Sequence, residues 1–379
     1  MTMLMQKTTL SQFALSALTL VSLMTLGLNA QAAESFKFRQ SSVGAFGGEM
    51  AAPADNPGFF ATAGLAKITI DKIAGPTGDD VTPADLGKAV APIVLNPAVP
   101  YRVVFPASTG TFHQDQTQLG VVAGYLTETK YAEGRVAFAV NLPFVQQKRL
   151  VTVTQGLGVL TPASASPALN GGAAVANTKV NEVMQAYLLT QNVETSGMGD
   201  AEFSTVWVRH QDRLKVAAGV SLFAPTGSYD KNRGPNPGFG DFYTLRPGVA
   251  VTYNLNPKHS DSTWDAGVTV AGRVSYGMNT TNKATDYKSG NFLYAEGGIV
   301  KVSGNWAYGM NLLSLQQMSD DTGTGATLGK RYKTYGGGPF VSFKIPGQDA
   351  GFNLHYASNF GGENAIVSKV LQLRFVKAW

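Results

Sequence analysis

Residues 263–278 alternate without a break between apolar side chains and small or polar ones, and this alternation limits the fold more than any other feature. A period of two is typical of a β-strand with one apolar face. At about 3.3 Å per residue and a tilt of about 45°, such a strand rises roughly 37 Å. Residues 214–222 and 245–255 repeat the pattern. The apolar face of the longest example comprises Trp264, Ala266, Val268, Val270, Gly272, Val274, Tyr276 and Met278.

An apolar face of this kind can contact either a soluble protein core or membrane lipid, and strand length distinguishes the two. Sandwich strands usually contain about 5–6 residues, whereas a strand that crosses the outer membrane needs about 9–11. The opposite face holds mainly Gly, Ala, Ser and Thr, which suits a barrel interior. Only 15% of the residues are charged, against roughly 25% in soluble domains. The sequence therefore predicts an all-β fold, a transmembrane antiparallel β-barrel.

The C-terminal residues provide an independent indication of such a barrel. Leu371, Leu373, Phe375 and Trp379 share one face of a predicted strand. The machinery that inserts barrels into the bacterial outer membrane is understood to recognise a last strand ending on an aromatic residue, so this machinery is an expected partner. Lys377 lies on the apolar face near its end, where a charge costs about 0–1 kcal/mol. An ordinary edge strand is the alternative interpretation.

Alternation and turn residues together predict twelve strands, an even number as in bacterial barrels. Residues 147–180 fit poorly, and a strand at 151–154 followed by a long loop leaves fourteen strands possible. The predicted outer loops are 226–240, 279–290, 319–330 and 361–365, with tight periplasmic links near 211–212 and 345–347. The predicted strands lie near residues 117–128, 135–146, 181–193, 200–210, 213–225, 241–255, 263–278, 291–302, 305–318, 331–345, 350–360 and 366–379.

Three segments are predicted along the chain. Residues 1–32 have the pattern of a secretory signal peptide, with Lys7, an apolar run and the small residues Ala30 and Ala32 before cleavage. Residues 33–113 are rich in proline, which removes backbone donors, so they predict an irregular lead-in or plug. Residues 114–379 form the barrel. The protein is therefore expected in the bacterial outer membrane, in contact with lipid and lipopolysaccharide.

Composition excludes several kinds of site. The chain contains no Cys, which excludes disulfides, Cys-ligated zinc and thiol catalysis. Four separated histidines give no compact metal site, and no cofactor is predicted. The net charge of +5 comes from scattered residues, without the basic stripe of a nucleic-acid groove, so no nucleic-acid partner is expected. No G-x-S-x-G nucleophile elbow occurs, so a barrel hydrolase remains only an alternative and no enzyme is predicted.

Short motifs follow one another in a fixed order through the predicted barrel. They comprise Gly199, Asp200, Thr226, Gly227, Asp230, Asp286, Tyr287, Gly290, Gln316, Gln317, Asp320, Asp321, Gly338 and Pro339. In order and spacing the chain resembles the meta-pathway phenol degradation family of outer-membrane proteins, over most of its mature length. The resemblance implies a barrel akin to long-chain fatty acid transporters that passes small hydrophobic or aromatic compounds. The stretch 155–180 and Asn291-Phe292 depart from the family pattern.

Three charged residues are candidates for the transport path. Arg246, Asp265 and Arg273 occupy the polar face of long strands, where charges partly desolvated by the wall would act on passing solutes. The alternative is that these residues form ion pairs that only stiffen the barrel.

Four aromatic residues of the lead-in are candidates for an apolar part of the plug or an internal binding site. Simple packing of the lead-in against the barrel wall is the favoured interpretation for these residues, which are Phe59, Phe60, Tyr101 and Phe105.

Acidic residues in the outer loops allow a further alternative. Asp320 and Asp321 could bind calcium, although solvated turn acids are the favoured interpretation, as for Asp230 and Asp286. No metal site is therefore predicted. The favoured function is a channel for small hydrophobic or aromatic solutes, and the alternative is a structural or adhesive barrel whose outer loops bind a partner.

Overall fold

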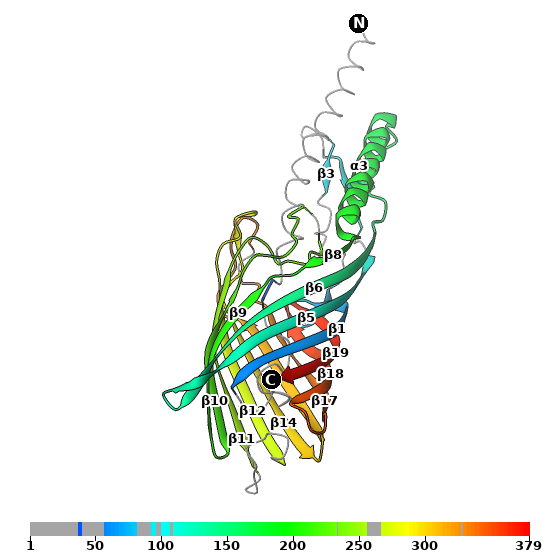
Figure 1. The fold of residues 1–379 in the computed structure, drawn as a ribbon. Coiled ribbons are helices and arrows are strands. Elements are labelled where there is room, and N and C mark those ends of the chain that lie inside the picture. The colour runs from blue at the N-terminus through cyan, green and yellow to red at the C-terminus, as the bar shows by residue number, and fades with distance from the viewer. Residues whose placement is uncertain are drawn as a thin grey trace.

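The fold is a closed antiparallel β-barrel, seen in a computed structural model that describes residues 37–39, 57–81, 92–95, 100–106, 109–232, 234–255, 267–326 and 329–379 (Figure 1). Each strand of the wall pairs with the next one along the chain, and the last strand pairs with the first, so the sheet has no open edge. The wall consists of β1 (Gly58–Ala74), β5 (Thr109–Tyr131), β6 (Gly134–Thr154), β9 (Glu202–Gln211), β10 (Leu214–Phe223), β11 (Thr244–Asn254), β12 (Val268–Asn279), β14 (Phe292–Ser303), β15 (Trp306–Gln317), β17 (Lys333–Lys344), β18 (Ala350–Glu363) and β19 (Ala365–Ala378).

The remaining elements lie beside or beyond one end of the wall. The longest is the helix α3 (Pro167–Gln191), which extends past that end of the barrel (Figure 1). Short strands pair with the wall or with one another. They are β2 (Asp80–Val81), β3 (Ile93–Val94), β4 (Arg102–Val104), β7 (Val159–Thr161), β8 (Glu194–Met198), β13 (Tyr287–Lys288) and β16 (Thr322–Gly323).

The alternation of side chains separates the outer face of the wall from its interior. On β12, Val270, Val274 and Tyr276 are exposed on the outer face, whereas Thr269 and Arg273 are buried in the interior. The apolar stripe therefore faces outward, away from any protein core, as a membrane barrel requires. In the described part of the chain, no helix has the length and apolarity needed to span a bilayer.

The two ends of the barrel differ in the length of their connections. Tight turns join β5 to β6, β9 to β10 and β14 to β15 at one end, with positive φ at Ala132, Glu133, Asp212 and Gly304. The other end carries most of the long connections, including β10–β11, β12–β14 and the one that contains α3, although the β11–β12 connection at the first end is also long. Outer-membrane barrels have short periplasmic turns and longer extracellular loops, so the end with most of the long connections is the extracellular end.

The count of twelve strands is confirmed, but one member of the predicted set is wrong and one strand of the wall is missing from it. Residues 181–193 lie mostly in α3, because alanines upstream favour a helix and Ala176 and Val180 are buried one turn apart on its inner side. Conversely, β1 belongs to the wall although it falls within the predicted lead-in 33–113. Pro57 precedes β1 and Pro76 follows it, so the surrounding prolines interrupt none of its hydrogen bonds.

Three further boundaries differ from the prediction. Residues 151–154 extend β6 and form no additional strand, so fourteen strands is wrong. The predicted loop 156–177 contains β7 and much of α3, while 361–365 is almost entirely strand, with Asn364 alone between β18 and β19. Residues 1–32, predicted as the signal peptide, lie outside the described residues.

A small subdomain covers the extracellular end of the long strands β5 and β6. The strands β3, β4 and β7 form a separate three-stranded sheet, and α3 packs against it. Because this subdomain has an apolar core of its own, it is a second packed unit attached to the barrel. The buried core residues are Ile93, Leu95, Val103, Phe105, Leu160, Ala176 and Val180.

Candidate functional site

Two buried ion pairs lie on the inner face of the barrel wall. The Arg246 guanidinium donates to Glu202 at 3.0 Å, and the Arg273 guanidinium donates to Glu296 at 2.7 Å. Arg246 and Arg273 therefore lie on the inner face of the wall, each paired with a glutamate from another strand. A role for these arginines in transport stays a prediction. Asp265, the third lumen candidate, lies outside the described residues. We call these four residues the charge layer.

The two glutamates of the charge layer were not among the predicted residues. Glu202 begins β9, and Glu296 lies at an inward position of β14. The parity of β14, on which Phe292 and Tyr294 are buried, could have identified Glu296 as a lumen residue. Identifying its partner required the register, which places Arg273 directly opposite Glu296 on adjacent strands.

The polar network continues around the barrel from the charge layer. The Asn311 side chain donates to Glu296 at 3.3 Å, and a ring nitrogen of His355 lies 2.8 Å from the Asn311 side-chain oxygen. Asn311 and His355 are each only 1% exposed, and Glu296 is 5% exposed. Removing one partner of a buried pair leaves a desolvated charge behind, so this network fixes the relative positions of β12, β14, β15 and β18.

Apolar residues line the interior on both sides of the charge layer. We call Phe292, Tyr294, Leu313 and Leu315, near the extracellular end, the outer cluster. Phe38 from the N-terminal segment and the partly buried Tyr332 also pack in it. The second group, near the periplasmic end, comprises Val300, Val302, Ala307 and Phe340.

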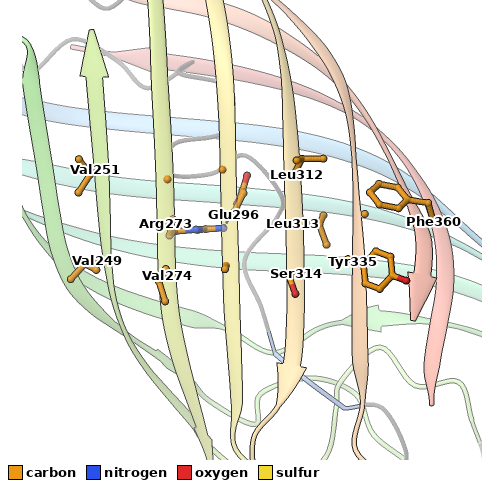
Figure 2. Close-up of a pocket in the computed structure, with 14 residues that line it drawn as sticks. Val249, Val251, Arg273, Val274, Glu296, Leu312, Leu313, Ser314, Tyr335 and Phe360 are labelled. Carbon is orange, nitrogen blue, oxygen red and sulfur yellow. Dashed lines mark hydrogen bonds and ion pairs between the residues drawn. The ribbon is translucent and has the colours of Figure 1, made fainter. Parts of the chain in front are cut away.

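A shallow cavity of about 690 Å³ lies against the wall formed by β11, β12, β14, β15 and β17 (Figure 2). Val249, Leu312 and Phe360, which line it, are exposed on the outer face. Figure 2 also shows Arg273 and Glu296 reaching toward one another from neighbouring strands. Since the exposed lining is apolar, this cavity is a lipid-facing groove that lies across the wall from the charge layer.

The four aromatic residues predicted for the plug do not come together. Phe59 and Phe60 lie on β1, where Phe59 is 67% exposed on the outer face and Phe60 faces inward over Gly124. Phe105 is buried in the core of the subdomain, and Tyr101 packs against the same core. The structure therefore places these four residues in two separate regions, because β1 is part of the wall and residues 101–105 fold with α3.

Comparison with known proteins adds sequence evidence to this geometry. The family model described as "Putative MetA-pathway of phenol degradation" matches residues 100–375. The chain belongs to this family. A search of curated proteins gives no match to the chain.

Solved structures share the architecture of this phenol-degradation family member. The COG4313 outer-membrane channel from Pseudomonas putida F1 is 12% identical and has a TM-score of 0.59, with 90% of this chain and 100% of that chain covered. The Pseudomonas putida toluene transporter TodX is 9% identical with a TM-score of 0.35, with 90% and 98% covered. The likeness to the COG4313 channel shows that this chain has the same fold. Family and fold together place the protein in the bacterial outer membrane.

The first family motif fastens the loop between β10 and β11 to the mouth of the barrel. The buried Asp200 carboxylate accepts hydrogen bonds from the backbone N–H groups of Gly227 and Phe239, at 3.0 and 2.8 Å. The Thr226 hydroxyl accepts from the Ala201 N–H at 2.8 Å. Gly227 has no room for a side chain, because an added Cβ would lie 2.5 Å from the Gly238 Cα. These residues position the extracellular loop.

The second motif joins two further outer loops through Asp321. Its carboxylate accepts from the Gly290 N–H at 2.8 Å, from the Gln317 side chain at 2.7 Å and from the Tyr287 hydroxyl. An added Cβ on Gly290 would meet the Ser319 carbonyl, so a glycine is needed there. Asp286 precedes this contact with φ of 55°, and its carbonyl accepts from the Thr324 N–H. The motif therefore closes the β13–β16 ribbon over the barrel mouth.

The loop acids considered for calcium have protein partners. Asp320 pairs with Arg331 at 2.7 Å, and the hydrogen bond from the guanidinium lowers the pKa of the Asp320 carboxyl. Asp230 caps its own loop, accepting from the Asn232 N–H at 2.9 Å. Within the ranges that the structure describes, no group of three His, Asp or Glu side chains is arranged to bind a metal ion.

The remaining motif positions lie in the wall itself. Gln316 is exposed on the outer face of β15, beside the buried Gln317. On β17, Gly338 is buried and Pro339 is exposed on the outer face. The pairing between β17 and β18 skips both residues. Pro339 has no N–H group to donate, and an added Cβ on Gly338 would meet the Tyr356 carbonyl, so a glycine is needed there.

Proposed function

We propose that this family member is an outer-membrane channel for the uptake of small hydrophobic or aromatic compounds. The observation that carries the proposal is the inward-facing outer cluster, in which Phe292 and Tyr294 present aromatic rings to the lumen on the extracellular side of the charge layer. A water-filled porin has a polar interior. An apolar lining instead suits a solute that gains free energy on leaving water.

Such a path would solve a physical problem at the cell surface. Packed, anionic lipopolysaccharide resists apolar solutes, so an apolar route through the barrel lowers the barrier. Membership in the phenol-degradation family agrees with this class of solute, and the likeness to the COG4313 outer-membrane channel agrees with a channel. The residues give no energy source, so passage would occur by binding and diffusion.

Uptake by cells tests the proposal directly. We expect cells that make the protein to take up phenol and toluene faster than cells that lack it, while sucrose uptake is unchanged. In planar bilayers the purified protein should show low ion conductance, because the charge layer is paired and buried. Equal uptake of aromatic compounds in both strains would contradict transport and leave the fold unaffected.

The exported and inserted forms of the protein carry two further proposals. Residues 1–32 would be removed after Ala32, which N-terminal sequencing of the mature protein tests.

The last strand, β19, would be recognised by the insertion machinery through Phe375 and the residue that follows the strand, Trp379. The outer surface of the barrel would contact lipopolysaccharide. Replacing both aromatic residues by Ala should lower the amount of folded barrel in cells. Unchanged assembly of this variant would argue against that recognition.

A second candidate function, partner binding or adhesion, is favoured by the subdomain formed by β3, β4, β7 and α3. A separately packed unit at the extracellular end can contact a surface partner without any flux through the lumen. Replacing residues 156–190 by a short Gly-Ser linker would test it. Lost cell-surface binding with normal aromatic uptake would support adhesion as an additional role, and unchanged surface binding would contradict it.

A further inference from the structure

Phe38 places an aromatic ring in the lumen in the middle of the outer cluster. Its ring lies 5.2 Å from that of Phe292 at an interplanar angle of 67°, and 5.0 Å from that of Tyr332 at 55°. Edge-on and tilted arrangements of this kind are favourable for aromatic rings. Leu313 and Leu315 complete an apolar enclosure, and Phe38 itself is only 7% exposed. The enclosure therefore accommodates one monocyclic ring.

A separate set of polar contacts holds the neighbouring residue. Arg39 is 2% exposed and donates from its guanidinium to Asp200 at 2.9 Å and to the Gly240 carbonyl at 3.1 Å. These partners lie in the loops at the barrel mouth, whereas the contacts of Phe38 come from β14, β15 and Tyr332. The anchor at Arg39 does not need the Phe38 ring, so the two contacts can be altered independently.

We propose that the enclosure formed by Phe292, Tyr294, Leu313, Leu315 and Tyr332 is a binding site for a monocyclic aromatic hydrocarbon, and that the Phe38 ring occupies it as an internal substitute. This inference rests on the proposed function and specifies its solute class. The side chain of phenylalanine is a benzene ring with one methylene substituent, so a pocket that fits Phe38 fits a singly substituted benzene. The Tyr294 hydroxyl already donates to Glu296 at 3.0 Å, which leaves the aromatic faces as the recognising surface.

Competition follows from this arrangement. A solute must displace the Phe38 ring. Its apparent affinity is therefore its intrinsic affinity for the empty enclosure multiplied by the fraction of time for which the enclosure is free of that ring. Removing the ring should leave an apolar cavity, and apolar cavities created by large-to-small substitutions can stay dry and bind benzene. The Phe38→Ala variant should therefore bind a small aromatic compound more tightly than the unmodified protein.

The test uses the full chain in lipid nanodiscs and follows fluorobenzene binding by ¹⁹F NMR. We expect Phe38→Ala to raise the affinity at least about tenfold, since an enclosure free one tenth of the time costs a factor of ten. Phe352→Ala is the matched control, because Phe352 is exposed on the outer face against Phe375 and reports partitioning into lipid. Heat modifiability on a gel confirms that each variant is folded. If Phe38→Ala does not fold, Phe38→Leu is measured instead, with a smaller gain expected.

The outcomes separate this inference from the proposed function. An unchanged affinity in folded Phe38→Ala or Phe38→Leu, or an equal gain in Phe352→Ala, would overturn the binding site even if the unmodified protein takes up aromatic compounds. Tighter binding in Phe38→Ala without any uptake by the unmodified protein would support the site and contradict transport. In the Phe38→Ala background, the further change Phe292→Ala should abolish the gain by removing one wall of the enclosure.

Discussion

β1, β5 and β6 contain 17, 23 and 21 residues, whereas β12, β14, β15 and β17 contain 12 each. Figure 1 shows the long strands rising beyond the rest of the wall toward α3. We call these two regions the long wall and the short wall. Both are sheets of the same barrel, so the additional length of the long wall needs an explanation other than crossing lipid.

The outer faces of the two walls explain the difference. On the short wall the exposed residues are apolar over most of each strand, as with Ile299 and Leu312. On the long wall, Leu65, Leu119 and Phe144 lie opposite one another where the continuous apolar face ends, and Leu150 is an isolated exposed apolar residue farther along β6. Beyond them comes a polar collar, which includes Lys67, Thr69, Asp71, His113, Asp115, Thr117, Gln146 and Lys148. We call the band of the outer face that carries the exposed apolar residues the apolar belt. The long wall therefore projects above this belt on the extracellular side and carries the subdomain.

The largest expected effect compares an ion pair of the short wall with one of the long wall. Glu296→Ala should destabilise the barrel by about 3–5 kcal/mol, because Arg273 would remain buried without its carboxylate. Glu194→Ala removes the partner of Lys148 from an exposed pair at 3.6 Å and should cost about 0–1 kcal/mol. Urea unfolding in lipid vesicles measures both free energies. An equal loss of unfolding free energy in the two variants would show that the inner face of the short wall is hydrated.

A loss of stability of similar size should be confined to the subdomain when its core is altered. Phe105→Ala removes a buried ring from its core and should cost about 3–5 kcal/mol locally. Because this core shares no residue with the barrel interior, the heat-modifiable band of the barrel should be unchanged. Limited proteolysis should instead cut near α3 in the variant and not in the unmodified protein. Loss of the folded barrel band would show that the long wall depends on the subdomain.

A lysine scan of the outer face tests where the apolar belt ends. Val274→Lys places a charge on the outer face in the middle of the short wall and should cost about 2–4 kcal/mol. Thr117→Lys lies in the collar, directly opposite Lys67, where the cost should be about 0–1 kcal/mol near the interface. The two unfolding free energies would coincide if residue 117 lay as deep in lipid as residue 274.

The sequence predicts the short wall well and the long wall poorly, for a physical reason. On β12, strict alternation exists because one face meets lipid and the other meets the lumen, so Arg273 was assigned inward correctly. On β1, the outer face changes from Phe59 and Leu65 to Lys67 and Asp71 within one strand, so no single apolar stripe marks it. The helix α3 packs in the core of the subdomain and is not a strand of the wall, so the barrel pattern does not apply to it.

The paired partners in the lumen depend on register, which alternation does not determine. Arg273 lies directly opposite Glu296 because of the register in which β12 and β14 pair. The position of Phe38 depends on a fold of the chain back into the barrel, some 250 residues before its contact with Phe292. Local patterns carry no information about contacts of that sequence separation, so the outer cluster could not be predicted from the sequence.

The smallest expected effect is a pH dependence confined to the collar of the long wall. His113 lies 2.7 Å from Asp71 and 3.0 Å from Asp115. Hydrogen bonds to Asp115 and then to Asp71 raise the pKa of His113 above its ordinary value. A group whose pKa is raised by folding stabilises the fold fully below its unfolded pKa, about 6.5, and loses that contribution as the pH rises through the folded value.

His113→Gln should therefore be slightly less stable than the unmodified protein at pH 5.5, and the two should be equally stable at pH 9. The difference should stay below about 1 kcal/mol, because exposed ion pairs are screened by water and salt. Urea unfolding at both pH values, repeated in 0.5 M salt, measures it. A difference that grows toward pH 9 would have the wrong sign, since neutral His113 no longer attracts the two carboxylates. That result would indicate that the His113 ring stabilises the collar by packing and not by its charge.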